Sequence, residues 1–289
     1  MTTTLPLRAS QPQMNIHIGV LALQGAFHEH LVLLRQSASL LSRSPLYAST
    51  TLSFSEIRNP LELSKCDALI LPGGESTTMS LVAARSGLLE PLREFVKTKR
   101  KPVWGTCAGL ILLAESANRT KANGQELIGG LDVRVNRNHF GRQTESFEAE
   151  LELGFLEEVE ELVGEQAKMG GFRSVFIRAP VVEKVLRPTE GRQEEQAGLE
   201  DTVVAPSKTV EEKRRGLVGR EVEGLARLPG RARALRDREV TAKDLGEDGD
   251  IVAVRQGNVF GTSFHPELTG DARIHVWWIK QVIDACRDS

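Results

Sequence analysis

The stretch IHIGVLAL, from Ile16 to Leu23, is a continuous run of β-branched and aliphatic residues. A strand that is apolar on both faces is typical of a parallel sheet covered by helices on both sides. A Gln-Gly pair ends the run, and apolar residues then recur at helical spacing from Ala26 to about Ser42. The next strand, Asp67 to Leu71, stops at a Pro-Gly-Gly turn. This order predicts βαβ units.

The same alternation continues along the chain. The spacing predicts helices over Ser76 to Ser86, Leu88 to Thr98, Leu110 to Ser116 and Asp271 to Cys286. Further strands are predicted over Val103 to Thr106, Ile251 to Arg255 and Val259 to Phe264. Shorter runs at 131–135, 146–153 and 174–179 predict antiparallel strands or an edge layer. We therefore predict an α/β fold with a mixed, mostly parallel sheet flanked by helices.

The segment at about 187–249 differs in composition from the rest of the chain. It is rich in Glu, Arg, Gly and Gln, and no aromatic residue occurs between Phe176 and Phe260. Such a segment buries too little apolar surface to order itself strongly. We interpret it as a low-complexity charged insert in a surface loop, with transient helix around Glu211 to Arg238.

The N-terminal residues 1–14 hold no apolar run long enough for a signal peptide. A transit peptide is the alternative, but prolines disfavour an amphipathic helix there. We interpret these residues as a disordered tail, with Met14 as an alternative start, and residues 15–289 as one domain. No stretch of about 18 uncharged apolar residues occurs, which predicts no membrane partner.

The charge and the cysteine content of the chain exclude some classes of function. The chain has 37 basic and 39 acidic side chains, so no net field favours a nucleic-acid backbone as partner. Its three cysteines, Cys66, Cys107 and Cys286, are too few and too scattered for a disulfide framework, and no two have zinc-ligand spacing. We expect a reducing, cytoplasmic location and no metal site.

The motif GTCAG (105–109) places Cys107 between a predicted strand and a predicted helix. Gly-x-Cys-x-Gly has the form of a nucleophile elbow, in which small neighbours permit a strained turn that presents the side chain. A cysteine at a helix N-terminus also lies among unpaired N–H groups that favour its thiolate. A lone cysteine is more often an inert buried thiol, but this context favours a nucleophile.

A nucleophilic thiol needs an acid/base partner, and His265 in TSFHPEL is the best of six histidines. Pro266 holds His265 extended, and residues two apart in an extended segment project to one side, so Glu267 can orient the ring. A surface histidine before a helix is the alternative. His28 and His30 are two apart on a helix and do not form a metal pair.

The stretch LILPGGESTTM (69–79) supplies consecutive glycines just after a buried strand. Their backbone N–H groups can point into a site and stabilise an oxyanion. A phosphate-binding loop is the rival interpretation, but no lysine follows the glycines and Glu75 would repel a phosphate. Ser76 or Thr77 is predicted to cap the following helix.

These motifs resemble the class I, triad-type glutamine amidotransferases, and within them the glutaminase subunits of pyridoxal 5'-phosphate synthase. GTCAGL and FHPEL suit the wider class. The narrower resemblance depends on LALQGAFHEH (21–30), LPGGESTTM (71–79), RNHFGRQTESFEAEL (137–151) and FIRAP (176–180). It covers about 16–187 and 250–284, without the tail and the insert, and implies a flavodoxin-like three-layer fold.

The resemblance implies that Cys107 is the nucleophile, His265 the general acid/base and Glu267 its orienter. It implies glutamine binding by Gly73, Gly74, Glu75, Arg137, Ile177 and Arg178, and oxyanion stabilisation by the backbone N–H groups of Gly74 and Ala108.

The implied reaction is hydrolysis of L-glutamine to L-glutamate and ammonia, without metal or organic cofactor. The ammonia would pass to a (β/α)₈-barrel synthase subunit, bound at the LQGAFHEH region, for pyridoxal 5'-phosphate (vitamin B6) synthesis. One alternative keeps this chemistry but serves another synthase. A second alternative is a binding or regulatory subunit without turnover.

Overall fold

The computed structural model describes residues 13–118, 125–137, 146–165, 170–187, 194–199, 201–217, 219–228 and 250–287. Within these residues eleven strands form one sheet. Their spatial order is β10 (Thr202–Val204), β5 (Ala114–Asn118), β6 (Leu131–Asn136), β9 (Val181–Val185), β12 (Asp250–Gln256), β13 (Val259–Thr262), β4 (Val103–Thr106), β3 (Ala68–Leu71), β1 (Met14–Leu21) and β2 (Thr50–Ile57). Strand β11 (Glu223–Leu228) also pairs with β12, while β7 (Ser146–Leu151) and β8 (Phe172–Ile177) form a separate antiparallel pair.

The sheet has a parallel half and a mixed half. Strands β2, β1, β3, β4 and β13 are parallel to one another, whereas β12, β9, β11 and β10 add antiparallel pairs. The predicted mixed sheet is confirmed. The parallel register also brings the carboxyl ends of β3, β4 and β13 to one edge, because Gly105 pairs with both Leu71 and Gly261. The Gly-Gly loop, Cys107 and the segment that leads to His265 follow these three ends.

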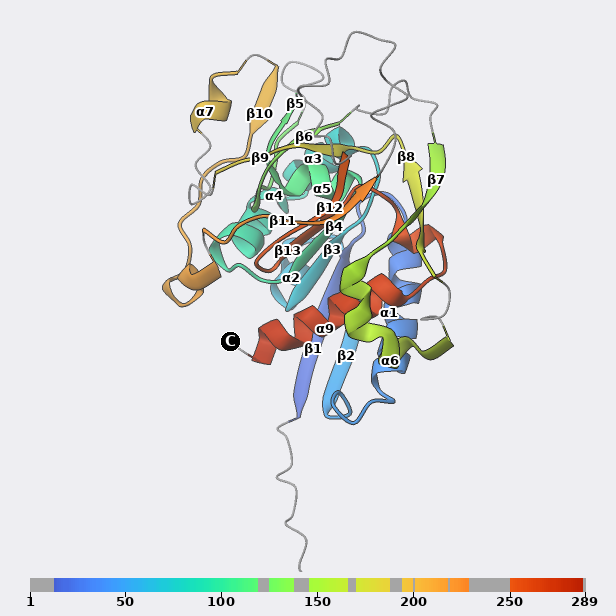
Figure 1. Cartoon of the computed structure of the whole chain (residues 1–289). Helices are drawn as coiled ribbons and strands as arrows, with labels where there is room; N and C mark the ends of the chain where they lie inside the picture. Colours follow the sequence, from blue (N-terminus) through green and yellow to red (C-terminus); the bar gives the residue numbers. More distant parts are fainter. Residues whose placement is uncertain are drawn as a thin grey trace, which may run out of the picture.

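Helices cover both faces of the sheet (Figure 1). One face packs against α1 (Phe27–Leu41) and α9 (Arg273–Arg287), together with η2 (Gly154–Val159), α6 (Glu160–Val163) and the β7–β8 pair. The other face packs against α2 (Pro60–Ser64), α3 (Ser76–Arg85), α4 (Leu89–Arg93), the π-helical turn η1 (Glu94–Thr98) and α5 (Ala108–Leu113). Short helices α7 (Glu194–Ala197), η4 (Glu212–Leu217) and η5 (Pro266–Leu268) lie in the connections. No described helix combines the length and apolarity that a membrane crossing requires.

Successive side chains of each apolar strand point alternately to the two faces of the sheet. In β3, Ala68 and Ile70 join the cluster under α1 and α9, while Leu69 and Leu71 join the cluster under α3 to α5. Complete burial of a leucine or isoleucine side chain contributes about 1.5–3 kcal/mol. Strand β3, which is buried on both faces, is therefore apolar at every position.

One predicted helix is wrong at its end. The helix expected over Leu110 to Ser116 stops at Leu113, and Ala114–Asn118 forms β5, which lies between β10 and β6. A short apolar run does not distinguish a buried helix from a buried strand. Here the neighbouring strands determine the outcome, because β5 pairs on both of its edges.

The segment 187–249 also differs from the expectation of a weakly ordered loop. Strand β10 pairs with β5, β11 pairs with β12, and Ala205 and Leu228 are buried. Backbone hydrogen bonds to an existing sheet edge order these pieces, although the segment has little apolar surface of its own. Helix η4 covers only part of the expected transient helix. Residues 188–193 and 229–249 lie outside the described residues, as do residues 1–12 of the expected tail.

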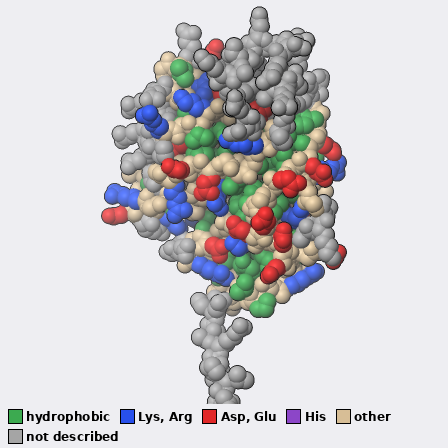
Figure 2. Space-filling view, in the orientation of Figure 1, with side chains coloured by type: hydrophobic (Ala, Val, Ile, Leu, Met, Phe, Trp, Pro, Cys, Tyr) green, Lys and Arg blue, Asp and Glu red, His purple; other side chains and the backbone are tan. Residues whose placement is uncertain are grey.

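Charged side chains of both signs are intermixed on the face of the molecule in Figure 2. Ion pairs between exposed side chains also occur, such as Arg173 with Glu148 at 2.7 Å. The charge pattern of this face therefore agrees with the near-zero net charge of the chain.

Candidate active site

Cys107 lies at the turn between β4 and α5. Its backbone has φ 48° and ψ −102°, and the positive φ is rare for a residue with a Cβ atom. Its N–H donates to the carbonyl of Thr262 on β13 at 2.8 Å, which holds the turn. The Sγ atom lies 3.8 Å from the carbonyl oxygen of Ile177 at the end of β8. This is the strained turn that the elbow motif predicts.

The two glycines of the motif permit this turn to pack. A Cβ atom on Gly109 would lie 2.0 Å from the carbonyl oxygen of Leu71, and one on Gly105 would lie 2.5 Å from the carbonyl carbon of Gly109. No backbone atom can approach a Cβ atom so closely. The glycines therefore let the start of α5 pack directly against β3 and β4.

His265 lies beside the thiol, with its side chain in hydrogen-bonding reach of Cys107. Its Nδ1 is 2.8 Å from Oε1 of Glu267, and its backbone N–H donates to Val175 of β8 at 2.8 Å. Burial disfavours the imidazolium, but the hydrogen bonds to Cys107 and Glu267 outweigh burial and raise the pKa of His265 to about 10. Two distant parts of the chain thus bring Cys107 together with His265 and Glu267.

Glu267 is 4% exposed, and its carboxylate has neighbours on both sides. Burial opposes its charge, yet His30 and His265 together lower the pKa of Glu267 below its ordinary value. Nε2 of His30 lies 3.4 Å from Oε2 of Glu267. The sequence does not predict this contact of His30 with Glu267, because it arises only when α1 packs across the sheet.

The Gly-Gly loop packs directly on the His265 ring. A Cβ atom on Gly73 would lie 2.2 Å from Cε1 of His265, and Gly74 has φ 154°. The N–H of Glu75 donates to Oε1 of Gln24 at 3.0 Å, which ties the loop to the end of β1. Gln24 was not predicted to be a site residue. Its position just after a parallel strand could have indicated it, because the carboxyl ends of parallel strands lie at one edge of the sheet.

Glu75 and Arg137 brace this loop through their side chains. The Glu75 carboxylate caps α3 by accepting from the N–H groups of Thr77 at 3.1 Å and Thr78 at 2.6 Å. The prediction that Ser76 or Thr77 supplies the cap is therefore wrong. The Arg137 guanidinium donates to the hydroxyls of Ser76 and Thr77, at 3.0 Å each.

The remaining predicted site residues, Arg178 and Ala108, directly follow Ile177 and Cys107 in the chain. Arg178 follows Ile177 with φ 46° and an exposed side chain. Ala108 is the first residue of α5, so its N–H has no acceptor within the helix. Residues 138–145 of the RNHFGRQTESFEAEL motif lie outside the described residues.

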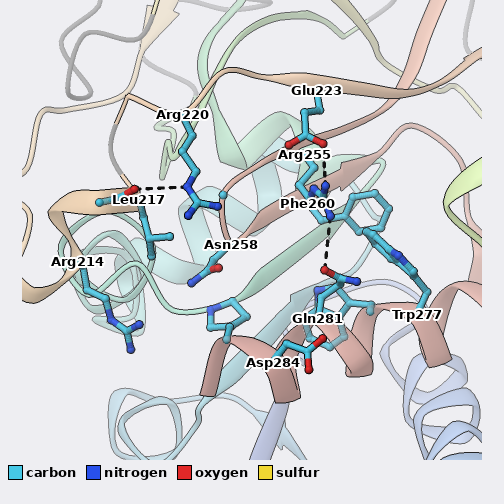
Figure 3. A pocket seen from close by; sticks show the side chains of 15 residues that line it. Arg214, Leu217, Arg220, Glu223, Arg255, Asn258, Phe260, Trp277, Gln281 and Asp284 are labelled. Atoms are coloured by element: carbon cyan, nitrogen blue, oxygen red, sulfur yellow. Dashed lines mark hydrogen bonds and ion pairs between the residues drawn. The ribbon is translucent and has the colours of Figure 1, made fainter. Parts of the chain in front are cut away.

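A cavity of about 420 Å³ lies elsewhere in the molecule, lined by η4, β11, the β12–β13 turn and α9 (Figure 3). Pro102 and Asn258, which line it, precede β4 and β13, whereas Cys107 follows the other end of β4. Arg255 in this cavity is held by Glu223 at 2.7 Å and by Gln281 at 3.5 Å. Across the described ranges, no group of three or more His, Cys, Asp or Glu side chains is arranged to hold a metal ion.

The fold and the site together define a protein class. The family model described as the SNO glutamine amidotransferase family matches residues 20–212 and 217–284, and the chain belongs to this family. A solved structure titled "Crystal structure of glutamine amidotransferase" superposes with a TM-score of 0.58 at 32% identity, covering 92% of this chain and 98% of that one.

Within the family, the chain is similar to pyridoxal 5'-phosphate synthase subunits. It is 40% identical to the probable subunit PDX2 of Arabidopsis thaliana, over 91% of this chain and 84% of that protein. It is also 40% identical to the subunit PdxT of Streptomyces griseus, over 92% of this chain and 95% of that protein. The probable subunit pdx2 of Dictyostelium discoideum is 32% identical, over 93% and 94% of the two chains.

Proposed function

We propose that the chain hydrolyses L-glutamine to L-glutamate and ammonia with Cys107 as the nucleophile. The observation that carries this proposal is the strained turn at Cys107, with its thiol in reach of an imidazole that Glu267 orients. A nucleophile, a base and an orienting group are the three parts that such acyl transfer requires.

The first half of the reaction forms a thioester. The Cys107 thiolate attacks the side-chain carboxamide carbon, and the N–H groups of Gly74 and Ala108 stabilise the developing oxyanion. The C–N bond then breaks, and protonated His265 gives its proton to the departing ammonia. Gly73, Gly74, Glu75, Ile177 and Arg178 surround the substrate, while Arg137 holds the loop that carries the glycines.

The second half releases glutamate. His265 removes a proton from water, the hydroxide attacks the γ-glutamyl thioester, and the carbon–sulfur bond breaks to restore the thiolate. Each step moves protons and electron pairs only among substrate, water and these side chains. Backbone dipoles supply the polarisation, so the proposed reaction requires no cofactor.

We further propose that the ammonia passes to a (β/α)₈-barrel subunit of pyridoxal 5'-phosphate synthase. The names of the relatives from Arabidopsis and Streptomyces support this acceptor over another synthase. The proposed location is the cytoplasm, which suits three cysteines that are all free thiols.

The test is glutamate release by the purified chain, measured with and without the synthase subunit. Cys107→Ser should lower kcat at least about a thousandfold, because the nucleophile is lost. Cys286→Ser, which removes a half-buried thiol from α9, is the matched control and should keep the wild-type rate. Equal rates for wild type and Cys107→Ser with the synthase subunit present would overturn the proposal.

A further inference from the structure

Two buried histidines lie behind the triad, on the side of Glu267 away from the thiol. His30 on α1 and His275 on α9 are both 0% exposed. Nδ1 of His30 is 2.9 Å from Nε2 of His275, and Nε2 of His30 is 3.4 Å from Oε2 of Glu267. A continuous line of polar groups therefore runs from His275 through His30 and Glu267 to His265.

Side chains of the central sheet pack against the two buried imidazoles. The ring of Trp104 on β4 packs edge-on against both imidazoles, with centroid distances of 5.5 Å to His30 and 4.8 Å to His275. Trp104 donates in turn to the hydroxyl of Thr262 at 3.3 Å. Thr106 places its hydroxyl 3.5 Å from Nε2 of His30. These neighbours come from the same strands that position Cys107.

One tautomer arrangement satisfies this geometry. Burial lowers the pKa of both His30 and His275, so each ring is neutral near pH 7 and carries a single N–H. A carboxylate only accepts, so His30 must present Nε2–H to Glu267, and His275 must then donate from Nε2 to Nδ1 of His30. The nitrogen left over is Nδ1 of His275, which has no hydrogen-bond partner in the described part of the chain.

The opposite arrangement is costly. It would point a lone pair of His30 at the carboxylate and bury an N–H of His275 without an acceptor, at about 1–3 kcal/mol. The chain of donors therefore has a single direction, toward Glu267. Oε2 of Glu267 has no hydrogen-bond partner among the described residues, and Nε2 of His30 lies 3.4 Å from it.

We propose that His30 is a positioning residue, which donates to Oε2 of Glu267 and so fixes the carboxylate that orients His265. This inference rests on the proposed glutaminase mechanism. The 3.4 Å separation exceeds that of a formed hydrogen bond, and such contacts tighten when the substrate binds. His275 selects the tautomer of His30. The charged groups that act on His30 are Glu267, His265 and, on its own helix, Glu29.

The test compares two amide variants at one position. The side-chain nitrogen of glutamine occupies the place of Nε2, so His30→Gln should keep kcat within about threefold of wild type. The side-chain nitrogen of asparagine corresponds to Nδ1 and does not reach Glu267, so His30→Asn should lower kcat at least tenfold with little change in KM. The control is His17→Gln, which replaces a histidine that hydrogen-bonds Ser53 and Ser55 on β2. This variant should change neither kcat nor KM.

A second readout is independent of turnover. The rate of Cys107 alkylation by iodoacetamide, followed against pH by peptide mass spectrometry, reports the reactivity of the thiol beside His265. In His30→Asn, Glu267 loses a donor and takes up a proton at higher pH, so the acid limb of this profile should move to higher pH. His30→Gln should keep the wild-type limb.

The outcomes separate the two proposals. If wild type does not hydrolyse glutamine but the alkylation profiles of the two variants differ as expected, the glutaminase function is overturned and the role of His30 is not. Identical alkylation profiles and kcat values for the two amide variants would overturn the role of His30 alone. Urea unfolding of both variants checks that each is folded in the assay.

Discussion

The imidazole of His265 lies between two acidic groups, and this placement determines its charge. Its pKa of about 10 means that the ring is protonated at neutral pH when the thiol and Glu267 are both present. By contrast, burial raises the pKa of the Cys66 thiol to about 12, which leaves that cysteine unreactive. Two cysteines in one chain thus differ in chemistry because only one has an imidazole beside it.

Replacing the thiol should therefore change the titration of His265. In Cys107→Ala the hydrogen bond to sulfur is lost, and we expect the pKa of His265 to fall by about 1 to 3. A raised histidine pKa stabilises the fold fully below about 6.5, the unfolded value, and the stabilisation is lost as pH rises through the folded value. The variant should lose this stability at lower pH than wild type.

Histidine NMR titration measures the shift directly, and urea unfolding at several pH values measures its effect on stability. Cys66→Ala, which removes a thiol remote from the triad, serves as the control. An unchanged His265 titration in Cys107→Ala would contradict the coupling between sulfur and imidazole.

Helix α5 illustrates how an element is shaped by its neighbours. Alanine favours a helix over glycine by about 1 kcal/mol, so Gly109→Ala would stabilise α5 if the helix were isolated. At this position, however, the added Cβ atom would lie 2.0 Å from the carbonyl oxygen of Leu71 on β3. The clash is with backbone, which cannot move aside by a rotamer change.

We expect Gly109→Ala to lower the free energy of unfolding by about 1–3 kcal/mol, the usual cost of overpacking. The control is Gly154→Ala at the start of η2, where an added Cβ atom meets nothing within 4 Å. Urea unfolding of the two variants provides the comparison. Equal midpoints would show that α5 can shift away from β3 without cost.

The sequence predicted those features of the fold and the site that depend on residues close together in the chain. The close approach of Cys107, His265 and Glu267 could be predicted because Cys107 directly follows a strand and Glu267 follows His265 by two residues. The roles of His30 and His275 could not be predicted, because they are 245 residues apart and meet only through the packing of α1 on α9. Strands β10 and β11 were missed for a related reason, since the sheet edges that order them are formed by distant residues.

A buried ion pair joins one of these missed pieces to the core. Lys97 on η1 is 1% exposed, and its ammonium lies 2.8 Å from Oε1 of Glu115 on β5 and 2.7 Å from the carbonyl oxygen of Pro206, just after β10. The N–H of Gly130 donates to the same carboxylate at 2.7 Å. Burial raises the pKa of Glu115 and lowers that of Lys97, so each charge depends on the other.

Lys97→Met removes the cation that is paired with the buried Glu115 carboxylate, and we expect a loss of about 3–5 kcal/mol in the free energy of unfolding. The double variant Lys97→Met with Glu115→Gln should recover most of this loss, because the amide oxygen still accepts from Gly130 and carries no charge. Lys99→Met, which breaks an exposed pair with Glu94, should cost no more than about 1 kcal/mol.

The pH dependence of the stability loss in Lys97→Met shows whether the charge of Glu115 causes it. Without Lys97, the pKa of Glu115 rises further, so the folded variant protonates this carboxyl more readily than the unfolded chain does. The destabilisation should then be smaller at pH 4 than at pH 7, because the cost of the buried charge appears only above the unfolded pKa. Urea unfolding at the two pH values measures the difference. A loss of equal size at both would mean that lost packing of the lysine stem, and not the unpaired carboxylate, destabilises the variant.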